Sequence, residues 1–192
     1  MMVKICGITN REDALAAVEA GASAIGFNFY RESPRYISHT GAAMIGEKIP
    51  TNVWKVGVFV DETPETIARI MIDADLDVAQ LHGCSEARGV RIWQAMSAVD
   101  PVALALIANV EAVLLDSTDG VTGGTGETWD WSKTPDLKPK IIIAGGLDAS
   151  NVRTAIEQAH PWGVDACSRI EKSPGLKDHD KMRRFIAAAL NS

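Results

Sequence analysis

The stretch Val3-Lys4-Ile5-Cys6-Gly7-Ile8-Thr9, close to the start of the 192-residue chain, decides how the rest can be interpreted. Its apolar run with β-branched residues stops at Gly7 and predicts a short buried strand, and Thr9 and Glu12 have the spacing of a capping box that begins a helix. Cys6 therefore lies where a strand ends. In parallel α/β folds this end of a strand carries the reactive groups. Cys6 is thus either a candidate catalytic thiol or a small buried core residue.

Seven further apolar runs follow, and helical patterns separate several of them. Eight strands in βα order predict an α/β fold, a single (β/α)8 TIM barrel domain over residues 1–192, with a doubly wound open sheet as the alternative. The predicted strands are Val3–Cys6, Ala24–Phe29, Lys55–Val60, Val78–His82, Arg91–Met96, Ala112–Asp116, Lys140–Ala144 and Gly163–Cys167. The predicted helices are Arg11–Ala20, Gly41–Ile49, Pro64–Ala74 with Thr63 as its N-cap, Asn151–Gln158 and Asp178–Leu190.

The chain is shorter than the roughly 250 residues usual for this barrel, so some helices must be short. Only Gly83–Val90 separates the fourth predicted strand from the fifth, and Asp100–Glu111 separates the fifth from the sixth. We therefore expect shortened helices in the region of units four and five.

Composition limits the classes of partner. The net charge is −6, and Arg183-Arg184 is the densest basic cluster, which argues against nucleic acid and anionic membranes as partners. No segment approaches the ~18 consecutive apolar residues of a membrane span, so we expect a cytoplasmic protein with a small-molecule partner. Cys6, Cys84 and Cys167 are far apart and lack C-x-x-C spacing, which indicates neither a disulfide framework nor a zinc site.

Chemically active side chains come at the ends of separate predicted strands. Alternate residues of a barrel strand point inward, so Cys6, His82, Asp116 and Asp165 should share the carboxyl mouth. Such a set is difficult to explain as packing. Taken singly, Asp116 could also be a turn cap and His82 a structural histidine.

Glycines and basic residues form a second group. Gly123-Gly124-Thr125-Gly126 follows the sixth strand, while Gly145-Gly146 and Cys167-Ser168-Arg169 follow strands seven and eight, whose loops often bind phosphate in these barrels. A phosphorylated substrate is therefore expected. Arg35, in Ser33-Pro34-Arg35-Tyr36, could pair with a substrate carboxylate or be an ordinary surface arginine.

With these pieces placed, the sequence resembles the phosphoribosylanthranilate isomerase family over nearly its whole length. The resemblance implies an Amadori rearrangement of N-(5′-phosphoribosyl)anthranilate in tryptophan biosynthesis, without a cofactor or metal. The matching motifs are Lys4-Ile5-Cys6-Gly7-Ile8-Thr9, Gly26-Phe27, Ser33-Pro34-Arg35-Tyr36-Ile37, Val56-Gly57-Val58-Phe59-Val60, Gln80-Leu81-His82-Gly83, Leu114-Leu115-Asp116, Gly123-Gly124-Thr125-Gly126, Trp129-Asp130-Trp131, Ala144-Gly145-Gly146-Leu147, Asn151-Val152 and Pro174-Gly175-Leu176-Lys177-Asp178.

The resemblance also implies roles for individual residues. Cys6 would be the general base, its pKa lowered by Lys4, and Asp116 the general acid. The family usually has Ser-Ser-Gly where this chain has Cys167-Ser168-Arg169, so a long side chain replaces a glycine beside the phosphate. The implied substrate-binding residues are Arg35, His82, Gly124 and Asp165, and the implied phosphate-binding residues are Gly145, Gly146, Ser168 and Arg169.

Two other functions fit parts of the pattern. A bifunctional sugar-phosphate isomerase of histidine and tryptophan biosynthesis resembles this chain in fold but uses an aspartate at the end of the first strand, where Cys6 stands. A non-catalytic phosphate-binding barrel would explain the short helices and Arg169. Both a monomer and a homodimer are compatible with the sequence. Barrel closure should also bring Cys6 and Cys167 near each other, which suggests that they could form a disulfide.

Overall fold

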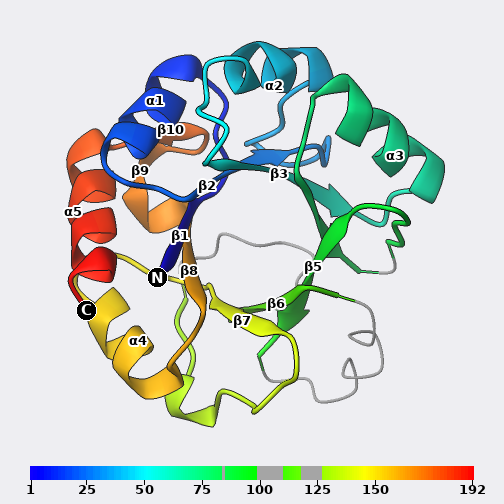
Figure 1. Cartoon of the computed structure of the whole chain (residues 1–192). Helices are drawn as coiled ribbons and strands as arrows, with labels where there is room; N and C mark the ends of the chain where they lie inside the picture. Colours follow the sequence, from blue (N-terminus) through cyan, green and yellow to red (C-terminus); the bar gives the residue numbers. More distant parts are fainter. Residues whose placement is uncertain (84, 99–109, 118–126) are drawn as a thin grey trace.

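The computed structural model describes residues 1–83, 85–98, 110–117 and 127–192. Eight parallel strands form a closed barrel in chain order, and the first strand pairs with the eighth (Figure 1). This closure confirms the predicted (β/α)8 barrel and excludes the open sheet. The strands are β1 (Met2–Ile5), β2 (Ala24–Asn28), β3 (Trp54–Val60), β4 (Val78–His82), β5 (Arg91–Ser97), β6 (Ala112–Asp116), β7 (Lys140–Ile143) and β8 (Gly163–Ala166).

Five α-helices of the described residues cover the outside of the barrel (Figure 1). Most begin and end within one residue of their predicted bounds. The second is the exception, because Ser38 caps it and it ends before the predicted Ile49. The helices are α1 (Arg11–Glu19), α2 (His39–Gly46), α3 (Pro64–Asp73), α4 (Val152–Ala159) and α5 (His179–Leu190).

The helix expected to be shortened in unit four is absent from the described residues 83 and 85–90, which lead directly from β4 to β5. For unit five the prediction falls largely on residues 99–109, which lie outside the described residues. Between β6 and β7, the described part contains only the short 3-10 helix η2 (Trp131–Lys133), which packs against α4.

Helix caps were predicted correctly at α3 and incorrectly at α1, although both helices begin at the predicted residue. Thr63 caps α3 by accepting a hydrogen bond from the Thr66 N–H group. At α1 the cap is Asn10, whose side chain accepts from the Asp13 N–H group at 2.8 Å, so the capping box predicted from Thr9 is wrong. The Thr9 hydroxyl instead donates to the carbonyl of Gly175, a contact that local spacing does not reveal.

That contact belongs to a β-hairpin that the sequence analysis missed. After β8 the chain forms a 3-10 turn, η3 (Ser168–Ile170), and then two antiparallel strands, β9 (Glu171–Ser173) and β10 (Leu176–Lys177). The Lys177 N–H group donates to the Asp13 carboxylate at 2.8 Å. The hairpin is therefore attached to the start of α1, next to the end of β1.

Two hydrophobic layers position the functional end of the barrel. One lies between the strands and the helices, and the other lies inside the barrel. At the amino end of the interior, Trp54, Trp93 and Trp162 pack with ring centroids 5.5–5.9 Å apart. These rings fill that end, so a ligand must enter from the carboxyl end of the strands.

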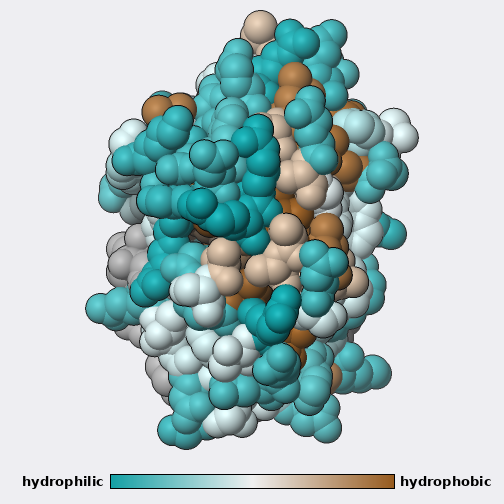
Figure 2. Space-filling model, turned by 90° about the vertical axis from the view of Figure 1, so that its left-hand side faces the viewer, coloured by the Kyte–Doolittle hydropathy of each residue, from teal (hydrophilic) through white to brown (hydrophobic). Residues whose placement is uncertain are grey.

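The outer surface of the helices is mainly polar, as expected for the side that faces solvent. Figure 2 shows that the side carrying α5 is mainly hydrophilic, with hydrophobic atoms limited to a narrow, broken band. Within the described ranges, no helix has the length and apolar character needed to span a membrane.

Candidate active site

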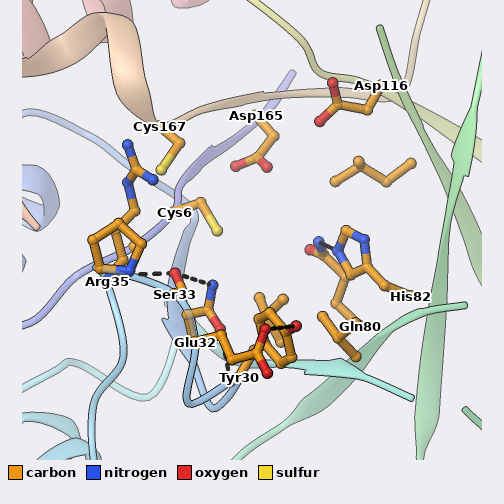
Figure 3. A pocket seen from close by; sticks show the side chains of 16 residues that line it. Cys6, Tyr30, Glu32, Ser33, Arg35, Gln80, His82, Asp116, Asp165 and Cys167 are labelled. Atoms are coloured by element: carbon orange, nitrogen blue, oxygen red, sulfur yellow. Dashed lines mark hydrogen bonds between the residues drawn. The ribbon is translucent and has the colours of Figure 1, made fainter. Parts of the chain in front are cut away.

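A pocket of about 230 Å³ opens at the carboxyl end of the barrel strands. Cys6, His82, Asp116 and Asp165, predicted to share this mouth, all line it (Figure 3). The Cys6 sulfur points into the pocket, while the Asp116 carboxyl group lies on the opposite side (Figure 3). A thiol and a carboxyl group thus face one cavity from separate strands.

Lys4 and Asp165 form a buried ion pair next to Cys6. The ammonium of Lys4, which is fully buried, binds the Asp165 carboxylate at 2.9 Å, so β1 and β8 are joined inside the barrel. Gly26 on β2 provides space for this arrangement. A Cβ atom there would lie 2.9 Å from the Cys6 sulfur and 3.1 Å from Lys4 Cε. The glycine of the Gly26-Phe27 motif therefore has a steric explanation.

The Cys6 environment favours its thiolate. A hydrogen bond from Cys167 and the positive charges of Lys4 and Lys177 hold the pKa of the Cys6 thiol well below its usual value, although burial opposes this. The pKa of Cys167 is raised by its hydrogen bond to Cys6 and by burial. Because Lys4 lies beside Cys6, the negative charge belongs on Cys6 and the proton on Cys167.

Asp165 has one free oxygen at the pocket. Burial raises its pKa to about 7, although the neighbouring Lys4 acts to lower it. Oδ2 accepts the hydrogen bond from Lys4, whereas the buried Oδ1 has no hydrogen-bond partner among the described residues. An unpaired buried acceptor is costly, so Oδ1 is suited to receive a hydroxyl group of a ligand.

Gln80 and His82 form a polar pair on the β4 side of the pocket. Gln80 Nε2 lies 3.0 Å from His82 Nε2, and the buried Gln80 Oε1 has no partner within the described parts of the chain. From sequence, this amide stood out only as part of the Gln80-Leu81-His82-Gly83 motif. Its unpaired oxygen makes it an additional candidate for substrate binding.

Asp116 is held at the mouth by its neighbours. The Ser117 hydroxyl donates to Asp116 Oδ1 at 3.1 Å. Gly145 has a φ of +83°, and a Cβ atom there would lie 2.9 Å from Asp116 Oδ1 and 2.7 Å from the Ser117 nitrogen. A glycine is therefore required for the loop after β7 to approach Asp116 this closely.

Arg35 lines the pocket but has a partner within the protein that the sequence analysis did not foresee. Its Nε donates to Glu171 Oε1 at 3.0 Å, and its Nη2 donates to Glu171 Oε2 at 2.8 Å. The bidentate geometry expected for a substrate carboxylate is thus used by Glu171. Arg35 is 9% exposed, so the interpretation as an ordinary surface arginine is wrong.

A smaller cavity of about 30 Å³ adjoins the main pocket. The residues predicted to bind phosphate, Gly145, Gly146, Ser168 and Arg169, all line it. The Arg169 guanidinium forms an ion pair with Asp148 at 3.1 Å. Gly124, the other glycine predicted to contact substrate, lies outside the described residues.

Glu171 and Lys177 are residues of the site region that the sequence analysis did not single out. Both come from the β9–β10 hairpin, and their side chains are only 4% and 0% exposed. The one available signal was the Pro174-Gly175-Leu176-Lys177-Asp178 motif, which gives no hint of a buried ion pair. Their partner Arg35 is more than 130 residues away in the sequence.

This fold and site define a (β/α)8-barrel enzyme in which a thiol and carboxyl groups face one pocket at the carboxyl end of the strands. The family model described as N-(5'phosphoribosyl)anthranilate (PRA) isomerase matches residues 3–188. The chain therefore belongs to the phosphoribosylanthranilate isomerase family, and its activity is the isomerisation of N-(5′-phosphoribosyl)anthranilate in tryptophan biosynthesis.

Individual relatives support this assignment. The N-(5'-phosphoribosyl)anthranilate isomerase of Solibacter usitatus is 48% identical over 197 aligned residues, which cover 98% of this chain and 97% of the relative. The crystal structure of the Thermus thermophilus enzyme has a TM-score of 0.88 at 34% identity and covers 100% and 99% of the two chains. A further isomerase structure, in complex with reduced 1-(o-carboxyphenylamino)-1-deoxyribulose 5-phosphate, has a TM-score of 0.82 at 34% identity and full coverage of both chains.

Proposed function

We propose that Cys6 is the general base and Asp116 the general acid of the isomerisation. The observation that carries this proposal is the Cys6 thiol, which faces the pocket and has a pKa well below its usual value. A thiolate can remove a carbon-bound proton, whereas a neutral thiol cannot. Asp116 faces the same pocket from the other side, where it can donate a proton (Figure 3).

The order of proton transfers follows from the chemistry of an aminosugar. Asp116 protonates the ribose ring oxygen as the bond from that oxygen to C1 breaks, leaving an iminium ion. The iminium makes the proton on C2 acidic, and Cys6 removes it to give an enolamine. The enolamine then becomes the ketone of the product by loss of the hydroxyl proton at C2 and gain of a proton at C1.

Substrate contacts are proposed from the unpaired groups of the pocket. Arg35 Nη1 makes no hydrogen bond to Glu171, so it is available to donate to the carboxylate on the aromatic ring of the substrate. Asp165 Oδ1 would accept a hydrogen bond from a ribose hydroxyl group, with His82 and Gln80 on the opposite side. The ligand bound to the related isomerase carries both an o-carboxyphenyl group and a phosphate, which agrees with these contacts.

The phosphate would occupy the small cavity beside Asp116. Gly145 and Gly146 lack side chains there and can present backbone N–H groups, and Ser168 can add its hydroxyl. Asn151 stabilises this loop by donating to the Gly146 carbonyl at 2.8 Å. A substrate with a single phosphate, and no cofactor, accounts for the proposed contacts.

The assay that tests the function follows the loss of anthranilate fluorescence on turnover of the substrate. An active enzyme should convert N-(5′-phosphoribosyl)anthranilate without added metal or cofactor. A barrel that only bound phosphate would instead bind the reduced product analogue without turning over the substrate.

We propose further that the enzyme works in the cytoplasm as a monomer or homodimer. The reduced thiols at Cys6 and Cys167 fit a reducing compartment. Light scattering on the purified protein distinguishes the two states.

Arg169 is expected to strengthen phosphate binding. If its guanidinium leaves Asp148 for the phosphate, it adds a charge-assisted contact of about 1.5–3 kcal/mol. Arg169→Ala should then raise KM by about tenfold or more, with the effect decreasing at high salt. Arg169→Gly is the matched variant, because it restores the residue usual in the family. A KM that is unchanged and independent of salt in both variants would contradict this contact.

Oxidation is expected to join Cys6 to Cys167. The register pairs Ile5 with Ala166, and Cys6 and Cys167 follow them on neighbouring strands, which lie ~5 Å apart, within the Cα separation that a disulfide spans. The Cys6 thiolate attacks hydrogen peroxide to give a sulfenic acid and hydroxide, and the Cys167 thiol then displaces water to form the disulfide.

Peroxide should therefore inactivate the wild type, and dithiothreitol should restore its activity. The Cys167→Ser variant should lose activity irreversibly on long exposure, because the Cys6 sulfenic acid is oxidised further when no resolving thiol is present. Peptide mass spectrometry identifies the disulfide, and Cys84→Ser is the control. Equal recovery of the wild type and Cys167→Ser would count against the disulfide.

A further inference from the structure

The carboxylate of Glu171 is the centre of a buried ion cluster behind the pocket. Oε1 accepts from Arg35 Nε at 3.0 Å, from Lys177 Nζ at 2.8 Å and from the Gly175 N–H group at 3.3 Å. Oε2 accepts from Arg35 Nη2 at 2.8 Å. Burial acts to raise the pKa of Glu171, but hydrogen bonds from Arg35 and the charge of Lys177 lower it overall, so Glu171 is ionised.

The three side chains of this cluster come from distant parts of the fold. Arg35 lies in the loop after β2, and Glu171 and Lys177 lie on β9 and β10. Gly7, at the end of β1, allows Arg35 to approach, since a Cβ atom there would lie 2.7 Å from Arg35 Cδ. The Arg35 side chain is 11% exposed, and its Nε and Nη2 atoms donate three hydrogen bonds to the carboxylate of Glu171, which does not line the pocket.

The formal charges of Arg35, Glu171 and Lys177 determine how strongly the cluster attracts an anion. An Arg35–Glu171 pair alone would be neutral and would attract an anion only weakly. Lys177 adds a second positive charge that does not line the pocket, so Arg35, Glu171 and Lys177 together carry +1, next to the Cys6 thiolate that Lys177 also helps to stabilise. The remaining Arg35 nitrogen, Nη1, has no partner among the residues that the structure describes. A second cation behind one guanidinium nitrogen without a protein partner suits a single carboxylate.

We propose that Glu171 and Lys177 are positioning residues that make Arg35 selective for the carboxylate on the aromatic ring of the substrate. Glu171 fixes the plane of the guanidinium so that Nη1 points toward the pocket, and Lys177 offsets the negative charge of Glu171. The inference rests on the proposed contact between Arg35 and that carboxylate. Beyond that contact, the inference assigns Glu171 and Lys177 the role of orienting Arg35 and balancing its charge.

Two substitutions separate orientation from charge. Glu171→Gln keeps the side-chain shape and raises the cluster charge to +2, so a purely electrostatic role predicts tighter binding of the carboxylate. Because three N–H donors and the Cys167 thiol surround the Oε1 position, the amide NH2 group would have to face Arg35 Nη2. Positioning therefore predicts weaker binding. Lys177→Met removes the charge with little change in volume, and Lys177→Arg keeps it.

The experiment measures the dissociation constants of two ligands by calorimetry. One is reduced 1-(o-carboxyphenylamino)-1-deoxyribulose 5-phosphate, and the other is the same molecule with an unsubstituted phenylamino group. The wild type should prefer the carboxylated ligand by about tenfold or more. Glu171→Gln and Lys177→Met should reduce the preference to below about threefold with unchanged affinity for the second ligand, and Lys177→Arg should restore it.

The second ligand also serves as the test of an intact site. Glu157→Gln, an exposed position on α4, is the matched control and should keep the wild-type preference. Equal weakening of both ligands in Glu171→Gln, or an unchanged preference in Glu171→Gln and Lys177→Met, would overturn the positioning role. A wild type without preference would show instead that Arg35 does not contact the carboxylate, which refutes the underlying contact.

Discussion

Replacing Cys6 with serine is expected to lower kcat by about 10²–10⁴-fold, the range typical of a lost general base. A serine hydroxyl cannot ionise near neutral pH, whereas Lys4 and the Cys167 hydrogen bond keep Cys6 ionised. Serine is close to cysteine in size, so the space beside Gly26 stays filled. The rate should be measured by anthranilate fluorescence, and binding of the reduced product analogue by calorimetry.

The pH dependence of kcat/KM in the wild type is a second test of Cys6 as the general base. A base acts when it has lost its proton, so kcat/KM should fall as the pH falls through the pKa of Cys6. Because that pKa is lowered, this acid limb should lie below the ~8.5 of an ordinary thiol. Cys167→Ser should keep the acid limb, because Cys6 is the titrating thiol and the serine hydroxyl can still donate a hydrogen bond to it. If Cys6→Ser kept most of its turnover, another group would have to be the base.

Replacing Asp116 with asparagine is expected to lower kcat by a similar factor of about 10²–10⁴. The amide keeps the shape of the side chain and can still accept the hydrogen bond from Ser117. It cannot donate a proton to the ribose oxygen as the ring opens. The loss should therefore appear in kcat, while the affinity for the reduced product analogue, which has no ring to open, should change little.

Asp165→Asn is a useful comparison, because Asp165 also lines the pocket but is bound to Lys4. Its loss should affect ligand affinity and folding stability as well, since removing one partner of a buried ion pair leaves the other charge unpaired. If Asp116→Asn retained wild-type turnover and Asp165→Asn alone abolished it, the acid would be Asp165.

Strand order and the carboxyl mouth could be predicted from sequence because both depend on local patterns. Parallel strands buried on both faces have continuous apolar runs, and eight of them with helical patterns between several predict the barrel. Alternation along each strand then assigns Cys6, His82, Asp116 and Asp165 to one mouth. Each of these inferences uses residues only a few positions apart.

Contacts between distant segments were beyond such reasoning. Thr9 has the spacing of a helix cap, but its hydroxyl binds the Gly175 carbonyl, and Asn10 caps the helix instead. Local spacing shows which hydrogen bonds are possible. The competing partner from the β9–β10 hairpin is brought near only by barrel closure.

The chemical state of the site was likewise decided by tertiary structure. Sequence identified Cys6 and its neighbour Lys4, but the pKa of Cys6 also depends on Cys167 and Lys177, which come from the other end of the chain. Arg35 could be predicted from sequence as the partner of a carboxylate, but the structure shows that its buried partner is Glu171, 136 residues later. Electrostatic interactions depend on distance in space and on burial, and only the folded chain determines these.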